Sequence, residues 1–443
     1  MTGKALLAGL ESASATELLE SLYGKSGVTA ARARYAALIA GLIDPQEFPP
    51  SDFPETAGEV RFFTAAGRTE LAGNHTDHNR GKVLAASIQL DVVAAVAPRG
   101  DKRVLFRSSG FPDVSIDLTD LSLQKSEAGS TESLVRGIAH SFFERGVKVK
   151  GFTANAGSTV FAGSGLSSSA AVEVLFGKLF DNLYGGGKRS ALEIAQIGQQ
   201  AENDYFEKPS GLMDQAASAS GGAVAIDFAD VTAPAVQALP FNPEEAGYVL
   251  CVVNTRGSHV DLTSDYAAIP EEMRAVARFF GRSALCEITR DAVLSRAAEL
   301  RKVTGDRALL RALHFFAEND RVDAMQRTLE TLAAAADAKA QAMQRYLTLV
   351  NQSGDSSWEL LQNSYPPHNT REQGISLALA LTRDFLHGEG ACRVHGGGFA
   401  GTIQAYIPQV HFAAYQERMD AVFGNAAVTA LRIRSVGTAE LVW

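Results

Sequence analysis

One segment, from Gly163 to Ala171, constrains what this chain can fold into and bind more than any other. It reads Gly-Ser-Gly-Leu-Ser-Ser-Ser-Ala-Ala, and the apolar run that follows it, up to Phe176, indicates the start of a helix. Glycine has no Cβ, so its backbone can approach a ligand closely. A helix N-terminus adds free N–H groups and a partial positive charge, and both favour a bound anion.

The three consecutive serines of this segment are more than a helix cap requires. A cap needs one hydroxyl, and Ser167 alone would supply it. The segment therefore predicts a site for the phosphates of a nucleotide. The residues assigned to it are Gly163, Ser164, Gly165, Leu166, Ser167, Ser168 and Ser169.

The two common nucleotide-binding motifs, the P-loop and the dinucleotide-binding glycine motif, are not matched convincingly elsewhere in the sequence. Gly24-Lys25-Ser26 resembles the end of a P-loop, but Leu19 stands where its first glycine is required. A G-x-G-x-x-G pattern begins at Gly396, but a strand-like run from Thr402 to Pro408 follows it. A dinucleotide-binding fingerprint opens a helix instead. The serine segment thus indicates another kind of ATP-binding enzyme.

Composition bounds the class of protein. The 443 residues are 46% hydrophobic and 21% charged, as in ordinary globular enzymes, and allow two to three domains. The net charge of −9 argues against a nucleic-acid or membrane partner. Cys251, Cys286 and Cys392 match no metal or disulfide spacing, and no signal peptide or long apolar run is visible. We therefore expect a cytoplasmic protein.

The periodicity of apolar residues predicts helices and strands mixed without a strict βαβ repeat, which favours an α+β fold. The predicted helices are residues 1–48, 134–143, 172–183, 191–205 and 322–349. The predicted strands are residues 60–64, 83–86, 92–96, 104–106, 114–116, 248–253 and 402–408. Proline clusters suggest three regions: a helical extension with a linker (1–56), a first domain (57–238) and a second domain (239–443).

Three further segments hold polar residues that packing does not require: Gly67–His78, Ala201–Tyr205 followed by Ser210–Gln215, and Val394–Gly401. Taken singly, each residue in them has an ordinary explanation. An isolated aspartate such as Asp214 is more often structural than catalytic. His75 and His78 are three residues apart, but a zinc site needs further ligands that the sequence does not offer.

With the serine segment, these make four landmarks whose order resembles the galactokinases of the GHMP small-molecule kinase family. The resemblance runs from about Arg61 to the C-terminus and is most specific at Gly67–Asp77, Gly163–Ala170 and Gly211–Gln215. It implies a two-domain fold with ATP and a sugar in the cleft between the domains. It also implies ATP-dependent phosphorylation of the sugar's anomeric hydroxyl.

The resemblance also assigns roles to single residues. Arg68 and Asp214 fall on the catalytic pair, and Ser169 and Glu202 on the ligands of Mg²⁺. The sugar-binding residues it implies are Asn74, His75, Thr76, Asp77, Gly211 and Tyr266. The chemistry agrees independently, because Mg²⁺ takes hard oxygen ligands and phosphoryl transfer is driven by positioning and charge stabilisation.

The chain departs from the family pattern on the sugar side. Asn74 replaces a usual glutamate and His78 a usual tyrosine, while Ala66, His395 and Gly397 differ elsewhere. A glutamate would repel a C6 carboxylate, since like charges about 4 Å apart cost roughly 4 kcal/mol at an effective dielectric near 20. Galactose is thus the first expected substrate, and D-galacturonate or another C6-modified galactose is the alternative. A sensor without turnover is a third possibility, disfavoured because the catalytic residues are all present.

Overall fold

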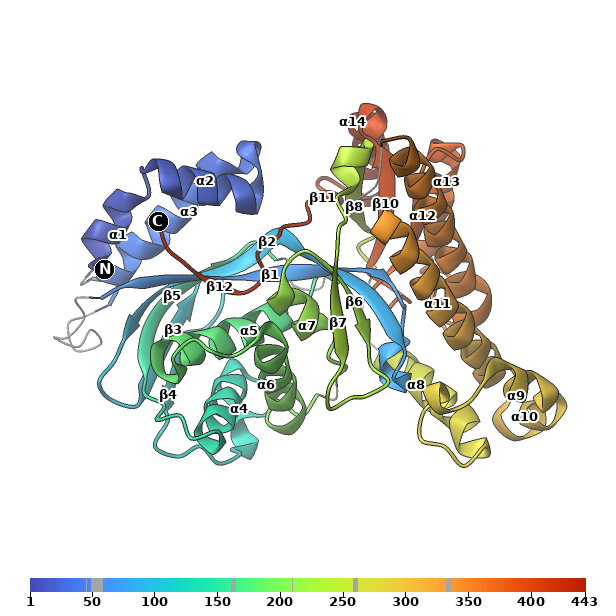
Figure 1. Cartoon of the computed structure of the whole chain (residues 1–443), viewed down its shortest axis with the longest axis horizontal. Helices are drawn as coiled ribbons and strands as arrows, with labels where there is room; N and C mark the ends of the chain where they lie inside the picture. Colours follow the sequence, from blue (N-terminus) through green and yellow to red (C-terminus); the bar gives the residue numbers. More distant parts are fainter. Residues whose placement is uncertain (45, 49–58, 161–164, 209, 258–261, 332–335) are drawn as a thin grey trace.

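The computed structural model describes residues 1–44, 46–48, 59–160, 165–208, 210–257, 262–331 and 336–443, and contains two β-sheets with helices packed around them (Figure 1). The helices are α1 (Gly3–Gly9), α2 (Ala13–Tyr23), α3 (Val28–Ile43), α4 (Thr131–Glu144), α5 (Ser168–Phe180), α6 (Ala191–Asp204), α7 (Met213–Ser220), α8 (Thr263–Phe279), α9 (Arg290–Ser295), α10 (Ala297–Thr304), α11 (Asp306–Thr331), α12 (Ala336–Ser356), α13 (Gly374–Leu386) and α14 (Phe412–Phe423). The strands are β1 (Arg61–Ala72), β2 (Lys82–Pro98), β3 (Arg103–Ser108), β4 (Val114–Asp117), β5 (Phe152–Ser158), β6 (Ala223–Asp227), β7 (Ala235–Leu239), β8 (Tyr248–Asn254), β9 (Ala391–His395), β10 (Thr402–Pro408), β11 (Val428–Leu431) and β12 (Ala439–Leu441).

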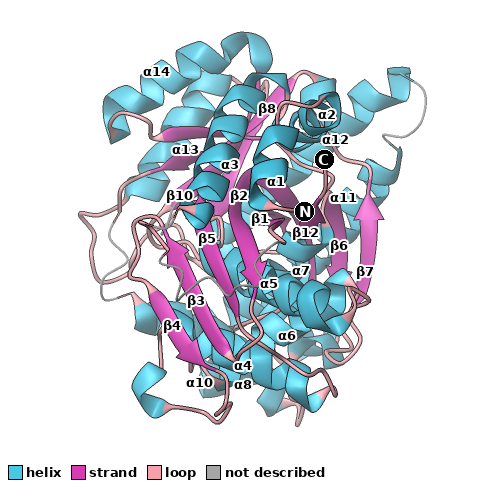
Figure 2. Ribbon diagram, turned by 90° about the vertical axis from the view of Figure 1, so that its left-hand side faces the viewer, coloured by secondary structure: helices cyan, strands magenta, loops and turns pink. Residues whose placement is uncertain are grey.

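The first sheet has eight strands in the order β12-β1-β2-β5-β3-β4, with β6 on β2 and β7 on β6 (Figure 2). Its pairings are antiparallel except for β3 with β5. The second sheet has the order β11-β8-β10-β9, so the boundary expected near residue 239 falls between strands of different sheets. Strand β12, at the end of the chain, returns to the first sheet beside β1, where Phe62 pairs with Leu441.

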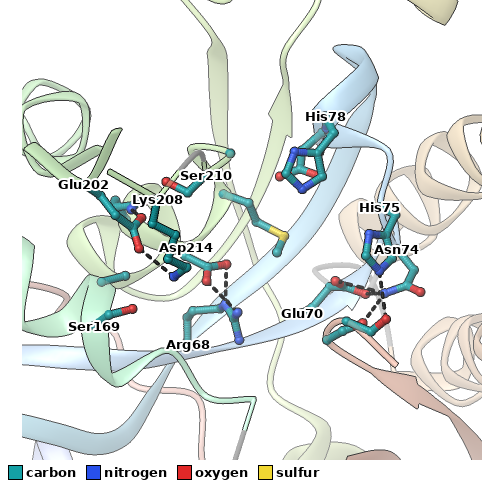
Figure 3. A pocket seen from close by; sticks show the side chains of 17 residues that line it. Arg68, Glu70, Asn74, His75, His78, Ser169, Glu202, Lys208, Ser210 and Asp214 are labelled. Carbon is teal, nitrogen blue, oxygen red and sulfur yellow. Dashed lines mark hydrogen bonds and ion pairs between the residues drawn. The ribbon is translucent and has the colours of Figure 1, made fainter. Parts of the chain in front are cut away.

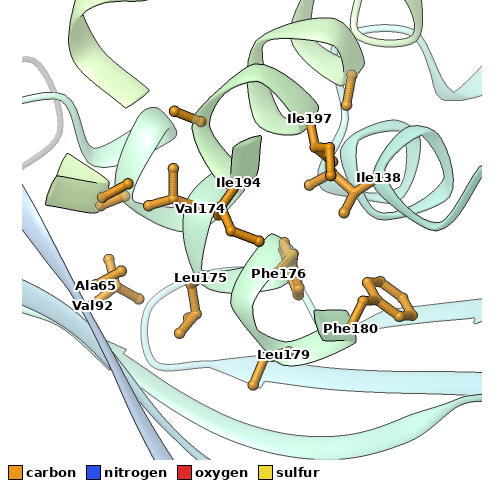
Figure 4. Close-up of a cluster of buried hydrophobic side chains, with 14 of the residues drawn as sticks. Ala65, Val92, Ile138, Val174, Leu175, Phe176, Leu179, Phe180, Ile194 and Ile197 are labelled. Atoms are coloured by element: carbon orange, nitrogen blue, oxygen red, sulfur yellow. The ribbon is translucent and has the colours of Figure 1, made fainter. Parts of the chain in front are cut away.

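Helices α4 to α7 cover one face of the first sheet and enclose the first core. Val174, Leu175 and Phe176 of α5 pack with sheet residues such as Ala65 and Val92, all of them buried (Figure 4). This core fixes α5 against β1, and therefore sets where the serine segment that precedes α5 lies.

The N-terminal helices cover the opposite face of the same sheet (Figure 1). Tyr35 and Ile39 of α3 are fully buried with Phe62 of β1 and Val93 of β2 in a separate core. Strands β1 and β2 are consequently buried on both faces, which explains their long apolar runs. The N-terminal extension is thus part of the packed fold.

A buried carboxylate, Asp91 of β2, connects this extension to the sheet and to the C-terminal segment. It accepts hydrogen bonds from Tyr23, Arg34 (2.7 Å), Thr64 (2.8 Å) and Arg434 (2.8 Å). Burial alone would raise the pKa of Asp91, but the two guanidinium groups hold it below its usual value. Four distant parts of the sequence therefore meet at one charged side chain.

Most elements expected from the sequence are present, including α4, α6 and β10. The region 1–48 is helical as expected, but it is divided into three helices, α1, α2 and α3. The strands expected at 83–86 and 92–96 are one strand, β2. The helix expected at 172–183 begins earlier, at Ser168, and ends in a π-turn from Asp181. Most of the expected linker at 45–56 lies outside the described residues. No helix among the described residues is long and apolar enough to cross a membrane.

Candidate active site

The landmark segments meet around one cavity of about 220 Å³. Its wall is formed by β1 and the turn after it, the start of α5, the end of α6, the start of α7 and the glycine turn after β9 (Figure 3). Residues from all four landmarks therefore line a single space, although up to 329 positions separate Arg68 from Gly397 in the sequence.

A β-bulge at Gly67 aims Arg68 into this cavity. Strand pairing skips Gly67, so Ala66 pairs with Asp91 and Arg68 with Ser87. A Cβ on Gly67 would lie 3.2 Å from the carbonyl oxygens of Leu90 and Leu166, which is tighter than ordinary packing allows. Bulges commonly re-aim a side chain beside an active site, and only glycine fits here without displacing its neighbours.

Arg68 and Asp214 form a bidentate ion pair in the cavity wall. Arg68 Nε lies 2.8 Å from Oδ1 of Asp214, and Nη2 lies 2.7 Å from Oδ2. The hydroxyl of Ser167 also donates to Oδ2, and Arg68 Nη1 donates to the carbonyl of Gly165. Burial alone would raise the pKa of Asp214, but Arg68 and the hydrogen bond from Ser167 hold it below its usual value. Asp214 is therefore ionised at neutral pH.

The serine segment leads directly into α5. Ser167 lies just before the helix with a left-handed backbone (φ 55°), and its hydroxyl bonds Asp214 instead of capping the helix. Ser168 and Ser169 are the first two residues of α5, and Ser169 lines the cavity. Gly163 and Ser164 lie outside the described residues. The described part of the segment therefore presents an uncapped helix N-terminus beside Arg68 and Asp214.

Glu202, at the end of α6, faces the same cavity with both carboxylate oxygens engaged. Lys208 Nζ lies 2.7 Å from Oε1, and Gln215 Nε2 donates to Oε2 at 2.9 Å. The same Gln215 amide donates to Glu173 at 2.8 Å. Burial, followed by the charge of Glu202, raises the pKa of Glu173 to about 8, so Glu173 is protonated at neutral pH. Glu202 is the acceptor carboxylate of this cluster.

Asn74 lines the cavity, but the protein itself uses its carboxamide. Its Nδ2 donates to Glu70 at 3.0 Å and to the carbonyl of Gly396 at 2.7 Å, and its Oδ1 accepts from Asn363 at 2.9 Å. Glu70 is in turn paired with the buried Arg393. The family pattern has a glutamate carboxylate at position 74. This chain has a neutral carboxamide there, and the carboxylate of Glu70 and the guanidinium of Arg393 lie next to it.

The other residues of the expected sugar tetrad differ in exposure to the cavity. Asp77 and His75 line it. His75 Nε2 lies 2.9 Å from the carbonyl of Gly397, and burial lowers the pKa of this imidazole to about 4, so it is neutral. The hydroxyl of Thr76 is fully buried and donates to backbone carbonyls of Gly73 and Lys82. Thr76 therefore shapes the turn and does not line the cavity.

Gly211 and Tyr266 differ in their relation to the cavity. Gly211 lines the cavity against Asp77, and a Cβ there would overlap the Asp77 carboxylate. Tyr266 does not line it: its hydroxyl donates to Gly398 at 3.0 Å and its ring packs behind Gly397. Of the residues assigned from the sequence, those that line the cavity are Arg68, Asn74, His75, Asp77, Ser169, Glu202, Gly211 and Asp214. Thr76 and Tyr266 lie behind its wall, and the described residues Gly165, Leu166, Ser167 and Ser168 do not line it.

Several residues of the site were given no role from the sequence. These are Glu70, Glu173, Lys208, Gln215 and Arg393. Glu173 carries a signal, since it is the one charged residue in the apolar run of α5 before Lys178. Lys208 carries none, because its position depends on how the chain turns after α6.

Comparison with protein families gives two matches. The N-terminal domain model of the GHMP kinases matches residues 133–222, and the galactokinase galactose-binding signature matches residues 51–98. These ranges contain the serine segment, Asp214, Arg68 and the sugar tetrad.

Known proteins give concordant matches. A galactokinase from Glaesserella parasuis serovar 5 (strain SH0165) is 31% identical over 372 residues, covering 81% of this chain and 90% of that protein. One from Actinobacillus pleuropneumoniae is 31% identical over 369 residues, covering 82% and 90%. Among solved structures, Lactococcus lactis galactokinase complexed with galactose matches with a TM-score of 0.72 at 24% identity, covering 87% of this chain and 96% of that one. A mevalonate kinase structure matches with a TM-score of 0.58 at 13% identity, covering 84% and 98%.

Proposed function

Since this chain belongs to the galactokinase family of GHMP kinases and is a sugar kinase that forms a sugar 1-phosphate, we propose that Arg68 and Asp214 transfer the γ-phosphoryl group of ATP to the C1 hydroxyl of galactose. One observation carries this proposal. The bidentate Arg68–Asp214 pair lies in one cavity with the uncapped start of α5 and with Glu202.

Asp214 is suited to receive the proton of the sugar hydroxyl. In the reaction the C1 oxygen forms a bond to the γ-phosphorus, the bond from that phosphorus to the bridging oxygen breaks, ADP leaves, and the hydroxyl proton passes to Asp214. Among the described residues only Arg68 donates to Oδ1, which leaves a lone pair for the sugar. The lowered pKa makes Asp214 a weak base, which suits a loose transition state that demands little of a base.

Arg68 is suited to stabilise the charge on the transferred group. A guanidinium has five N–H donors, and the bonds to Asp214 and Gly165 use three of them. The remaining donors can meet phosphoryl oxygens, while the N-terminus of α5 holds the other phosphates. Removing one preorganised donor of this kind typically costs about 10²–10³ in kcat.

The residues assigned to Mg²⁺ fit this ion. Ser169 offers a hydroxyl and Glu202 a carboxylate on the same cavity, and Mg²⁺ usually takes one or two carboxylates and completes its shell with phosphates and water. When bound, the ion would neutralise charge on the phosphates. Among the described residues no three histidine, cysteine or carboxylate side chains gather as a metal site.

For the sugar, the geometry favours galactose over D-galacturonate. A C6 carboxylate would need a donor or a positive charge near Asn74. Both N–H groups of Asn74 are already engaged, and His75 is neutral. The Glu70 carboxylate beside Asn74 is ion-paired with Arg393, so this pair offers a uronate no net positive charge.

The test is a coupled assay of ADP release with ATP, Mg²⁺ and a panel of hexoses and hexuronates, on the wild type and on Asp214→Asn. We expect turnover with galactose, and a loss of at least about 10³-fold in kcat in the variant with nucleotide binding retained. Sugar binding without turnover by any sugar would support the sensor alternative. Activity of Asp214→Asn close to wild type would remove the role assigned to Asp214.

We also propose that the enzyme works in the cytoplasm. Cys251, Cys286 and Cys392 are all free thiols, and Cys251 and Cys392 are buried in the core of the second sheet. A reducing compartment keeps such thiols unpaired. Fractionation of cells that produce the protein, with activity assayed in each fraction, tests this location.

A further inference from the structure

Among the described residues that line the cavity, Lys208 is the one lysine or arginine that the proposed reaction leaves without a role. Its ammonium lies 2.7 Å from Oε1 of Glu202, between that carboxylate and Asp214 (Figure 3). The Lys208 side chain is 58% exposed, whereas that of Glu202 is 4% exposed. The ion pair therefore joins a nearly buried carboxylate to a largely solvated lysine at the edge of the cavity.

This ion pair occupies the position that the metal needs. One Glu202 oxygen accepts from Gln215, which lies in the protein interior, and the other accepts from Lys208. A divalent cation and an ammonium cannot share the same oxygen without strong repulsion. Coordination of Mg²⁺ by Glu202 therefore requires Lys208 to leave, and Gln215 can stay in place.

Lys208 can leave at little cost. Glu202 is the only ion-pair partner of Lys208 among the described residues, and the largely solvated ammonium can return to water when it leaves. The arriving metal would then balance the charge of the nearly buried Glu202 carboxylate, so that this carboxylate is not left unpaired. The backbone N–H of Lys208 stays anchored to the carbonyl of Glu202 at 3.1 Å, so the stem of the side chain remains at the cavity.

We propose that Lys208 is a further catalytic residue, one that balances the charge of Glu202 before the metal arrives and then binds the transferred phosphoryl group. This rests on the proposed function, in which Glu202 is a metal ligand and Asp214 receives the sugar proton. A lysine ammonium is a compact charge on a flexible four-carbon stem, which suits a group that exchanges one anionic partner for another. As the bond to the bridging oxygen breaks, Lys208 and Arg68 share the charge on the phosphoryl oxygens.

The test compares Lys208→Met and Lys208→Arg with the wild type. Lys208→Met removes the charge at similar length, and we expect kcat to fall about 100-fold with KM for galactose within twofold. It also removes a competitor of the metal, so affinity for Mg²⁺ in the presence of ADP, measured by isothermal titration calorimetry, should rise about fivefold to tenfold. Lys208→Arg keeps the charge and should recover at least a tenth of the wild-type kcat.

The matched control is Lys82→Met, which breaks a lysine–carboxylate pair of similar length, 2.8 Å to Asp323, outside the cavity. It should leave kcat and metal affinity unchanged. Unchanged kcat in Lys208→Met, or weaker metal binding in it, would overturn the proposal, since the second result would make Lys208 a support for Glu202. Failure of the proposed function looks different: wild type without Mg²⁺-dependent turnover, or Glu202→Gln with unaltered metal affinity.

Discussion

Gly211 offers a sharp test of the sugar site, because it touches the Asp77 carboxylate. An ideal Cβ at Gly211 would lie 2.1 Å from Oδ2 and 3.1 Å from Cγ of Asp77. The backbone of Gly211 is not in the left-handed region, so alanine fits its dihedral angles. The substitution Gly211→Ala therefore has one main consequence, which is a displacement of the Asp77 carboxylate.

The size of that displacement follows from the contact distance. Real Cβ atoms essentially never approach another atom closer than 3.0 Å, so the carboxylate must move by about 1 Å. A misplacement of about 1 Å at a positioning residue costs on the order of 10²-fold in rate. We expect kcat/KM for galactose to fall about 100-fold, and KM for ATP to stay within threefold. The free energy of unfolding should change by less than about 1 kcal/mol, because only a side-chain end moves.

The assay is steady-state ADP release with each substrate varied in turn, together with urea unfolding. Gly100→Ala is the matched control, since a Cβ there meets no atom within 4 Å and its backbone is not left-handed. If Gly211→Ala retains kcat/KM for galactose within threefold of the wild type, Asp77 does not bind the sugar in the way that the family resemblance implies. An equal loss of kcat/KM for ATP, caused by a higher KM for ATP, would also refute the reasoning, because it would indicate a general distortion of the cavity.

Two further predictions concern buried carboxyl groups. The pKa of Glu173 is about 8 in the folded protein, compared with an ordinary value of 4.5. Between these two pH values the folded state holds a proton that the unfolded state lacks. The free energy of unfolding therefore falls as the pH rises through this range. Glu173→Gln should therefore be more stable than wild type at pH 8 by a few kcal/mol, at about 1.4 kcal/mol per pKa unit, and this gain should vanish near pH 5. A difference in unfolding free energy between the two proteins that does not change with pH, measured by chemical unfolding, would contradict this. Asp91→Asn leaves the buried Arg434 without its charge partner and should cost about 3–5 kcal/mol in urea unfolding, and a loss below about 1 kcal/mol would mean that Asp91 does not tie the N-terminal helices to the sheet.

Where the sequence was sufficient, the signal was local. The serine segment, the α3 periodicity and the alternation in Thr402–Pro408 each depend on neighbours a few positions away, and each gave the right element. Strand β2 was divided in two because polar residues from Ser87 to Asp91 interrupt its apolar run. Their partners are distant: Ser87 Oγ donates to the carbonyl of Ala217, and Asp91 pairs with Arg434. No local pattern reveals a polar residue that a remote partner satisfies.

The same limit explains what the sequence missed in the site. Glu70 depends on Arg393, which is 323 positions away, and the ion pair between them is created by the approach of β1 to β9. Lys208 depends on the turn after α6, which brings its backbone to the carbonyl of Glu202. Residues that carry a motif were identified from the sequence, whereas residues that neutralise or position them were identified only from the fold.

The Glu70–Asn74 contact also determines how the choice of sugar must be tested. Asn74→Glu alone would place a carboxylate where Asn74 Nδ2 now lies 3.0 Å from Glu70, and like charges at about 4 Å cost roughly 4 kcal/mol at an effective dielectric near 20. We expect this variant to lose about 2–4 kcal/mol of unfolding free energy, so that reduced activity would mix instability with specificity. The double variant Glu70→Gln/Asn74→Glu again has one carboxylate and one carboxamide at these two positions, as the wild type does. At least half of the unfolding free energy lost in Asn74→Glu should therefore return. Together with the wild type and the single variant Glu70→Gln, these two proteins form a double-mutant cycle, measured by urea unfolding and by kcat/KM for galactose and galacturonate. Additive stabilities would mean that the two side chains are not coupled. An unchanged ratio of the two sugars in the stable double variant would mean that this pair does not select the substrate.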